Sequence, residues 1–242
     1  MLFCTRSGCF FMSAYDITRL SISLIAILVI LIYFVVSILP KNMQISTKFI
    51  SRTAIFAALS TILYVVPYLK FPVPFFPNFL EIHLDEIPTL IAGFAYGPLS
   101  AIFIIVIKTL IKLPMTSTMC VGELADLIYS LAFILPCSLI YKKHRTFKGA
   151  IVSISVGTVF QLVVSSLVTS FGMLNFYMAV MGLSEETIIN MCKAINPNVT
   201  SLGWTFLVFV ALPFNAFKDA IVIVATLLLY KRIRWLIEKI SA

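Results

Sequence analysis

Charged residues are scarce in this sequence. Asp, Glu, Lys and Arg make up 12% of the 242 residues, whereas 61% are apolar. So few charges cannot cover a water-soluble domain, which excludes that class. Several apolar runs approach or exceed the roughly 20 residues that cross a bilayer as a helix, and the short alternating segments of a membrane barrel are missing. The predicted fold class is therefore an all-α integral membrane protein.

Signatures of catalysis and nucleotide hydrolysis are also missing. The sequence has no GxxxxGK[ST] phosphate loop, no HExxH and no GxSxG. The five cysteines lack CxxC spacing and the two histidines lie far apart, so we expect no metal site and cysteines that simply pack. We expect a protein that is not an enzyme. Any transport energy would come from an ion gradient or from a partner with a nucleotide site.

Apolar segments predict membrane helices near residues 20–39, 50–69, 88–112, 121–141, 149–181 and 203–230. Gly97-Pro98 should divide the third segment, which gives seven helices, the first half of that pair being too short to cross upright. We divide the chain into 1–42, a tail with an extra transmembrane helix or signal-anchor, and 43–242, a six-helix membrane domain. Met43 is an alternative start.

Basic residues predict the orientation. Clusters precede the second span, separate the 121–141 and 149–181 spans, and follow the last span. By the positive-inside rule these three places are cytoplasmic, which puts the C-terminus in the cytoplasm and the segment 75–88 outside. The net charge of +8 is then a topology signal with some attraction to anionic lipid, and we expect no nucleic-acid binding.

Five ionisable residues fall inside the predicted spans: Lys108, Glu123, Asp126, Lys218 and Asp219. Charge in hydrocarbon is costly and is usually kept for a site or an ion pair. Glu123 and Asp126 share one helical face, and we expect them to face Lys108 across the turn at 115–121. The same three residues could instead form a purely structural network.

The last predicted helix carries a second polar group. Asn215 and Lys218 are three residues apart, which places an amide and an ammonium side by side. Asp219 points about 100° away from Lys218 and is a poor partner for it. Lys218 should therefore line a polar cavity unless an acid neutralises it.

The segment 75–88 is polar and rich in proline. Leu80, Ile82 and Leu84 alternate with polar residues, which predicts an extended strand that could serve as a lid. Asp85 should cap the helix that follows, with Glu86 in its first turn. The phenylalanines of this loop form either an interfacial belt or a surface that stacks on a planar ligand: Phe71, Phe75, Phe76 and Phe79.

Several short motifs follow one another along the chain. The loop and the helix after it read FFPNFLEIHLDEIP (75–88) and IAGFAYGPL (91–99). Further motifs are GELA (122–125), FILP (133–136), YKK (141–143), LPFNAFK (212–218) and YKR (230–232). In this order they resemble motifs of the riboflavin-specific S-components of energy-coupling-factor (ECF) vitamin transporters. The ordered set covers roughly residues 50–235 and is more specific than any one motif.

The resemblance implies a six-helix substrate-binding subunit in a bacterial plasma membrane. It would bind riboflavin or a related flavin in an outward cavity closed by the loop between its first two helices. Uptake would be energised by a shared module of two cytoplasmic ATPases and a transmembrane scaffold subunit, with no cofactor besides the transported ligand. The alternatives are an S-component for a different vitamin or a stand-alone ion-coupled transporter.

The resemblance also implies roles for single residues. Asn215 and Lys218 match positions that hydrogen-bond the flavin ring, and the lid loop would meet the ligand at Phe79, Leu80 and Glu81. Ala54 and Ala58 match small residues that pack on the scaffold subunit, and small residues four apart do permit close helix approach.

Some expected ligand positions depart from the family pattern. Thr169-Ser170 replaces an Asn-Tyr pair, and Lys108-Thr109 replaces a Lys-Asn pair. Asp126 stands in place of an asparagine, and Asp219 in place of a glycine. Lys108 and Thr169 remain candidate ligand contacts, but these departures leave the exact vitamin open.

Overall fold

The structure is a computed structural model that describes residues 4–5, 8–9, 46–69, 71–72, 75–77, 80–116, 120–175, 178, 182 and 184–241. The helix predicted at 20–39, and with it the separate segment 1–42, falls almost wholly outside these residues. The short strands β1 (Cys4–Thr5) and β2 (Gly8–Cys9) pair antiparallel.

Helices make up nearly all of the described chain. They are α2 (Thr47–Val65), α3 (Glu86–Tyr96), α4 (Pro98–Lys112), α5 (Val121–Lys143), α6 (Phe147–Leu167), α8 (Glu185–Lys193), α9 (Trp204–Phe206) and α10 (Leu212–Ser241). Turns of 3-10 helix follow α2 at Pro67–Leu69 and α4 at Leu113–Met115. Turns of π-helix extend α6 over Val168–Met173 and join α9 to α10 over Leu207–Ala211.

The all-α prediction is confirmed. Within the described residues, five helical stretches are long and apolar enough to cross a membrane: Thr47–Val65, Pro98–Met115, Gly122–Lys143, Phe147–Met173 and Trp204–Tyr230. The predicted break at Gly97-Pro98 is also confirmed. Gly97 has a φ of +90°, which favours glycine, and Pro98 opens α4.

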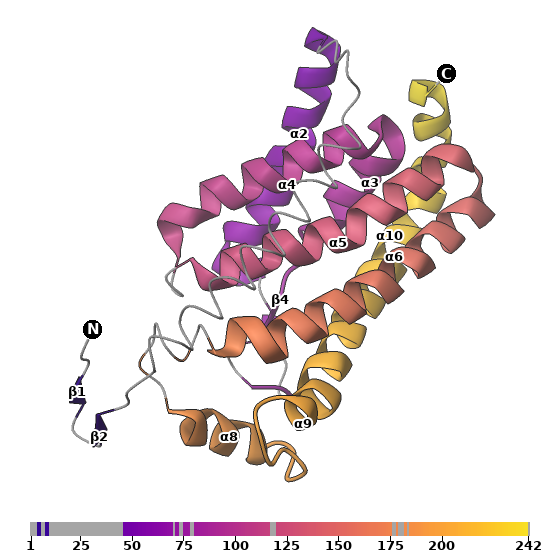
Figure 1. Ribbon diagram of the computed structural model, residues 1–242. Helices are drawn as coiled ribbons and strands as arrows, with labels where there is room; N and C mark the ends of the chain where they lie inside the picture. The colour runs from indigo at the N-terminus through magenta and orange to yellow at the C-terminus, as the bar shows by residue number, and fades with distance from the viewer. Residues whose placement is uncertain are drawn as a thin grey trace.

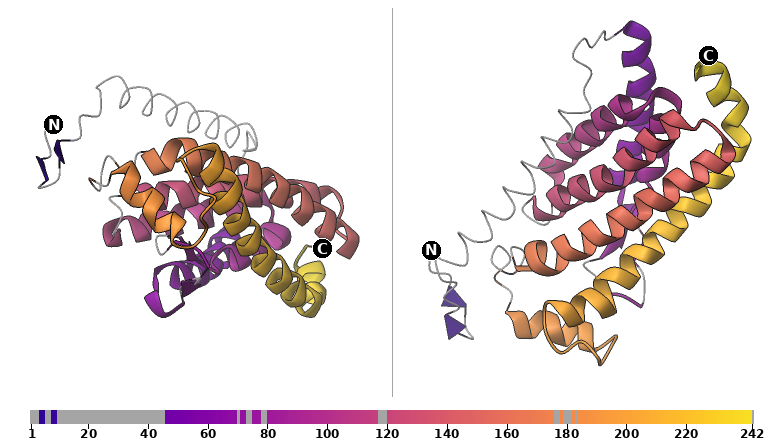
Figure 2. Two further views of the ribbon diagram at one scale, coloured as in Figure 1. Left: turned by 90° about the horizontal axis from the view of Figure 1, so that it is seen from below. Right: turned by 45° about the vertical axis from the view of Figure 1, so that its right-hand side comes forward.

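The long helices lie side by side, and their ends gather in two places (Figure 1). The start of α2, the loop between α5 and α6 and the end of α10 lie at one end, which we call the basic end. The helices α8 and α9 lie at the other, which we call the loop end, and a second view agrees (Figure 2). The basic clusters expected to face one side of the membrane thus do share one end.

Side-chain caps define several helix starts. Ser46, Thr146 and Ser184 accept backbone N–H groups at the first turns of α2, α6 and α8. The sequence analysis missed α8, which is short and polar. The capping serine followed by Glu185 and Glu186 was the signal that could have revealed it.

An aromatic cluster closes the basic end of the bundle. Tyr141 of α5 and Tyr230 of α10 share a hydrogen bond of 2.7 Å between their hydroxyls, and both are buried. The ring of Phe94 in α3 lies 4.3 Å from that of Tyr141, and Phe147 packs 6.1 Å from Tyr230. Four helices therefore meet at one hydrogen-bonded aromatic contact.

Tyr230→Phe should lower the free energy of unfolding by about 1–3 kcal/mol, because it removes the buried hydrogen bond between the Tyr141 and Tyr230 hydroxyls. Thermal unfolding in detergent measures this. Tyr68→Phe is the matched control, since Tyr68 is 93% exposed and its loss of a hydroxyl should have no effect. Equal melting temperatures for the wild type and both variants would contradict the prediction.

Candidate ligand-binding site

The loop between α2 and α3 forms a small hairpin at the loop end. Its strands β3 (Phe71–Pro72) and β4 (Glu81–Ile82) pair antiparallel, which confirms part of the predicted strand. Phe76 packs edge-on against Phe214 of α10 with ring centroids 5.3 Å apart. Leu80 packs against an apolar cluster that includes residues of α8, of α9 and of the π-helical turn before α10. The hairpin thus contacts the helices of the loop end, as a lid would.

Asp85, just before α3, contacts Lys108 of α4. The Lys108 Nζ donates to Asp85 Oδ2 and, at 2.9 Å, to Ser130 Oγ of α5, and Lys108 is 0% exposed. Burial acts to raise the pKa of the Asp85 carboxyl, but the nearby cationic groups, Lys108 first among them, together outweigh burial and hold that pKa below its ordinary value. Asp85 occupies the N-cap position of α3 and Glu86 lies in the first turn, as predicted, but the Asp85 side chain makes no cap bond.

Glu86, the next residue, contacts Lys218 of α10. The Lys218 Nζ lies 3.2 Å from Glu86 Oε1, and both side chains are buried. We call Asp85 and Glu86 the acid pair. Because its two members hold lysines from different helices, the acid pair joins the end of the hairpin to α4 and α10.

The acids expected to face Lys108 have other partners. Glu123 accepts a hydrogen bond from Thr116 at 2.8 Å, and Asp126 accepts one from Tyr64 of α2, also at 2.8 Å. The prediction that Lys108 pairs with these two acids was wrong, whereas the structural alternative describes Lys108 well. A helical wheel gives the face of each acid but not which helix lies opposite.

His83 had no role in the sequence analysis, and the structure places it beside this network. Its ring packs edge-on against Tyr64 at 5.2 Å, and its Nε2 lies 3.9 Å from Asp126 Oδ2. Among the described residues, no group of three or more His, Cys, Asp or Glu could hold a metal ion.

The remaining site candidates lie as follows. Asn215 is buried on α10 and donates to the Ala211 carbonyl at 2.8 Å. Thr169, in the π-helical extension of α6, shares a hydrogen bond of 2.6 Å with Tyr129 of α5. Phe79 lies outside the described residues, as does the side chain of Glu81. Ala54 and Ala58 are both exposed on α2.

Buried polar atoms without a hydrogen-bond partner among the described residues occur on the inward faces of several helices. One oxygen of Glu86 and both oxygens of Asp219 belong to this set. The prediction that Asp219 is a poor partner for Lys218 is confirmed, because Lys218 bonds Glu86 instead. The other side chains in the set include Thr109, Thr158, Gln161, Ser166, Ser170 and Thr226. Such atoms require partners, which a polar ligand or water can supply.

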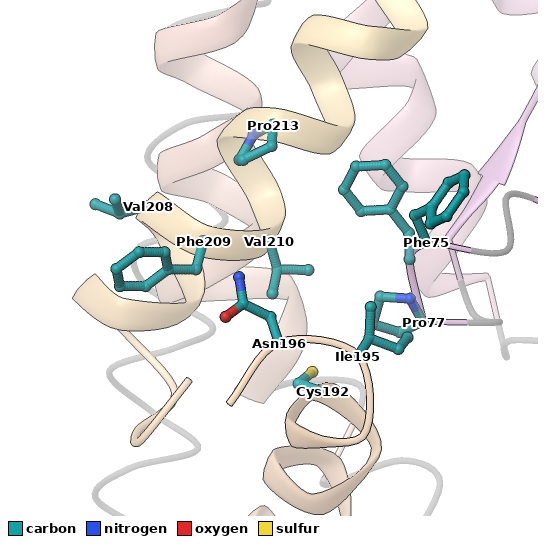
Figure 3. A pocket seen from close by; sticks show the side chains of 10 residues that line it. Phe75, Pro77, Cys192, Ile195, Asn196, Val208, Phe209, Val210 and Pro213 are labelled. Atoms are coloured by element: carbon teal, nitrogen blue, oxygen red, sulfur yellow. The ribbon is translucent and has the colours of Figure 1, made fainter. Parts of the chain in front are cut away.

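An apolar cavity of about 340 Å³ lies between the hairpin and the helices of the loop end (Figure 3). Its lining residues are Phe75, Phe76, Pro77, Cys192, Ile195, Asn196, Val208, Phe209, Val210 and Pro213. Burial raises the pKa of the Cys192 thiol to about 11, so the thiol stays protonated and packs without reacting. None of Asp85, Glu86 and Lys218 lines this cavity, so the cavity is separate from the acid pair.

Together these features define a class. The protein is a multi-pass helical membrane protein whose bundle encloses paired charges beneath a hairpin, together with polar groups that have no hydrogen-bond partner among the residues that the structure describes. The sequence profile of the ECF transporter substrate-specific component family matches residues 48–230, and the chain belongs to that family. It is thus a component of a transport system rather than an enzyme, as expected.

Two relatives and one solved structure agree with this assignment. The riboflavin transporter RibU of Staphylococcus aureus (strain TCH60) is 28% identical over 82% of this chain and 96% of its own. The riboflavin transporter FmnP of Bacillus subtilis (strain 168) is 29% identical over 80% of this chain and 97% of its own. A solved S component of a bacterial ECF transporter superposes with a TM-score of 0.57 and 24% sequence identity. The match covers 77% of this chain and 95% of that one, which supports the fold.

Lys218→Met should lower the free energy of unfolding by about 3–5 kcal/mol, because Glu86 then stays buried without its partner. Adding Glu86→Gln should recover part of that loss, since the stranded charge is removed. Thermal unfolding of the detergent-purified single and double variants measures the coupling. The exposed Lys193→Met is the control. A double variant as unstable as the sum of the single variants would show that the pair is not coupled.

Proposed function

We propose that this S component binds riboflavin or a closely related flavin and passes it into the cell. Transport is energised by an ECF module of two cytoplasmic ATPases and a transmembrane scaffold subunit. The observation that carries the proposal is the polar interior beneath the hairpin. It combines side chains that have no hydrogen-bond partner in the described residues with the amide and ammonium of Asn215 and Lys218. The names of the two relatives support a flavin as the ligand.

Flavin chemistry fits this interior. The flavin ring carries carbonyl and nitrogen acceptors on a flat apolar body, and its side chain carries several hydroxyls. Lys218 keeps donors beyond the one directed at Glu86, and with Asn215 it offers hydrogen bonds to the ring. We assign Thr169 a further ring contact and Phe79, Leu80 and Glu81 the contacts from the lid. Lys108, fully buried and held by Asp85 and Ser130, positions the lid instead.

The basic end faces the cytoplasm in this proposal. Lys48 and Arg52 lie on the first turns of α2, and Lys142 and Lys143 end α5. These positions gather at the same end as the end of α10 (Figure 1). The C-terminus is therefore cytoplasmic, the membrane is the bacterial plasma membrane, and the hairpin opens to the outside.

Ala54 and Ala58 supply the contact with the scaffold subunit. Both are exposed on α2, and their neighbours Ile55, Leu59 and Ile62 are exposed large apolar residues. Two small side chains one turn apart leave space for a second helix to approach closely.

Titrating the detergent-purified chain with riboflavin should quench the flavin fluorescence with submicromolar affinity, because an enclosed site excludes water and stacks aromatic groups on the ring. Competition with thiamine and biotin tests the choice of vitamin. Neither should displace the flavin. No quenching by riboflavin or its phosphate at micromolar protein would refute the flavin assignment.

Ala54→Trp and Ala58→Trp should abolish uptake and co-purification with the ECF module while riboflavin binding to the isolated chain stays unchanged. A bulky ring prevents close helix approach but lies away from the interior. Ala216→Trp, at an exposed alanine on α10, is the matched control and should assemble normally. Normal uptake by the Ala54 and Ala58 variants would show that this face of α2 does not contact the scaffold subunit.

A further inference from the structure

We infer that Asp219 of α10 and Gln161 of α6 form a subsite that binds the hydroxyl-bearing side chain of the flavin. The inference rests on the proposed function and adds two ligand contacts to it. Both residues lie in the bundle interior, and the resemblance to the family assigned neither of them a role.

Asp219 carries a buried carboxyl group to which no described residue donates a hydrogen bond. It is 0% exposed, and neither Oδ1 nor Oδ2 has a hydrogen-bond partner among the described residues. The lysine beside it in sequence donates to Glu86 instead. A buried carboxyl group in this state is costly unless a ligand or water brings donors to it.

Gln161 is also buried, and its side-chain amide has no hydrogen-bond partner among the described residues. Its side chain is fully buried, and neither Nε2 nor Oε1 has a hydrogen-bond partner in the described part of the chain. A carboxamide can both donate and accept, so two buried unpaired amide atoms require a partner that does both. A hydroxyl group meets that requirement.

Gln161 and Asp219 face the same region between α5, α6 and α10. A Cβ at Gly157 would collide with the Cys137 Sγ, so α5 and α6 are in close contact there, and Gln161 follows one turn later on the same face of α6. Val222, three residues after Asp219 on the same side of α10, packs in one core cluster with Cys137. The faces of α6 and α10 that carry Gln161 and Asp219 are therefore both directed toward α5.

The heights of the two residues in the bundle agree. The rings of Phe147 and Tyr230 lie 6.1 Å apart and fix the register of the antiparallel helices α6 and α10. Asp219 lies about 16 Å along α10 from Tyr230, and Gln161 lies about 21 Å along α6 from Phe147. The two residues are thus within about one helical turn of each other in height.

The chemistry of the subsite selects hydroxyl groups. Lys218, the residue before Asp219, is already paired with Glu86. Asp219 therefore needs hydrogen-bond partners from outside the protein. A hydroxyl can exchange hydrogen bonds with both the Asp219 carboxyl group and the Gln161 amide, whereas the flat flavin ring offers mainly acceptors.

A comparison of two ligands tests the subsite in the full chain purified in detergent. Riboflavin carries the hydroxyl chain, and lumiflavin has the same ring with a methyl group in its place. In Asp219→Leu and Gln161→Leu, the dissociation constant for riboflavin should rise about tenfold or more, while that for lumiflavin should change less than about twofold. If the two side chains served only to hold the fold together, their loss would weaken the binding of riboflavin and of lumiflavin by the same factor.

Thr226→Val is the matched control, because Thr226 is also fully buried on α10 without a hydrogen-bond partner among the described residues, about two turns beyond Asp219. It should leave the ratio of the two affinities unchanged. If Asp219→Leu does not fold, Asp219→Asn keeps the shape and should still weaken riboflavin alone, by about threefold.

Equal changes for riboflavin and lumiflavin in both the Asp219 and Gln161 variants would overturn the subsite while leaving flavin binding intact. A wild-type chain that binds neither ligand would instead overturn the proposed function, and the subsite with it. The two failures are therefore distinguishable in the same titration.

Discussion

Two consecutive carboxylates at the start of α3, each held by a lysine from a different helix, are the constraint on which the rest of this structure depends. Asp85 with Lys108 and Glu86 with Lys218 are buried, so each charge is tolerable only while its partner is present. The acid pair directly follows the hairpin. The end of the hairpin is therefore fixed to α4 and α10 by ion pairs, in addition to the apolar contacts that Phe76 and Leu80 make.

This arrangement separates the molecule into two regions with different physical character. The basic end is closed by packed rings and by the Tyr141–Tyr230 hydrogen bond. Toward the loop end, the interior contains charged pairs and polar atoms without hydrogen-bond partners in the described part of the chain, and a separate apolar cavity lies beside the hairpin. A ligand with a flat ring and a polar chain matches this interior better than a purely apolar ligand does.

The sequence predicted the helices well but not the contacts between them. Gly97-Pro98 revealed the break between α3 and α4, because glycine and proline act locally. Helical spacing correctly separated Asp219 from Lys218, since that relation lies within one helix. It could not show that Asp85 reaches Lys108 or that Glu86 reaches Lys218, because these pairs depend on how three helices pack. The short helix α8 was missed because no apolar run marks it.

A ligand-bound structure that resolves side chains is the most direct test of the central claim. The account predicts a flavin in the interior within hydrogen-bond distance of Asn215 and Lys218, with the Lys108–Asp85 contact unbroken beneath the closed hairpin. A flavin bound instead in the apolar cavity lined by Phe75 and Pro213, or a Lys108 that leaves Asp85 to bind the ligand, would contradict it.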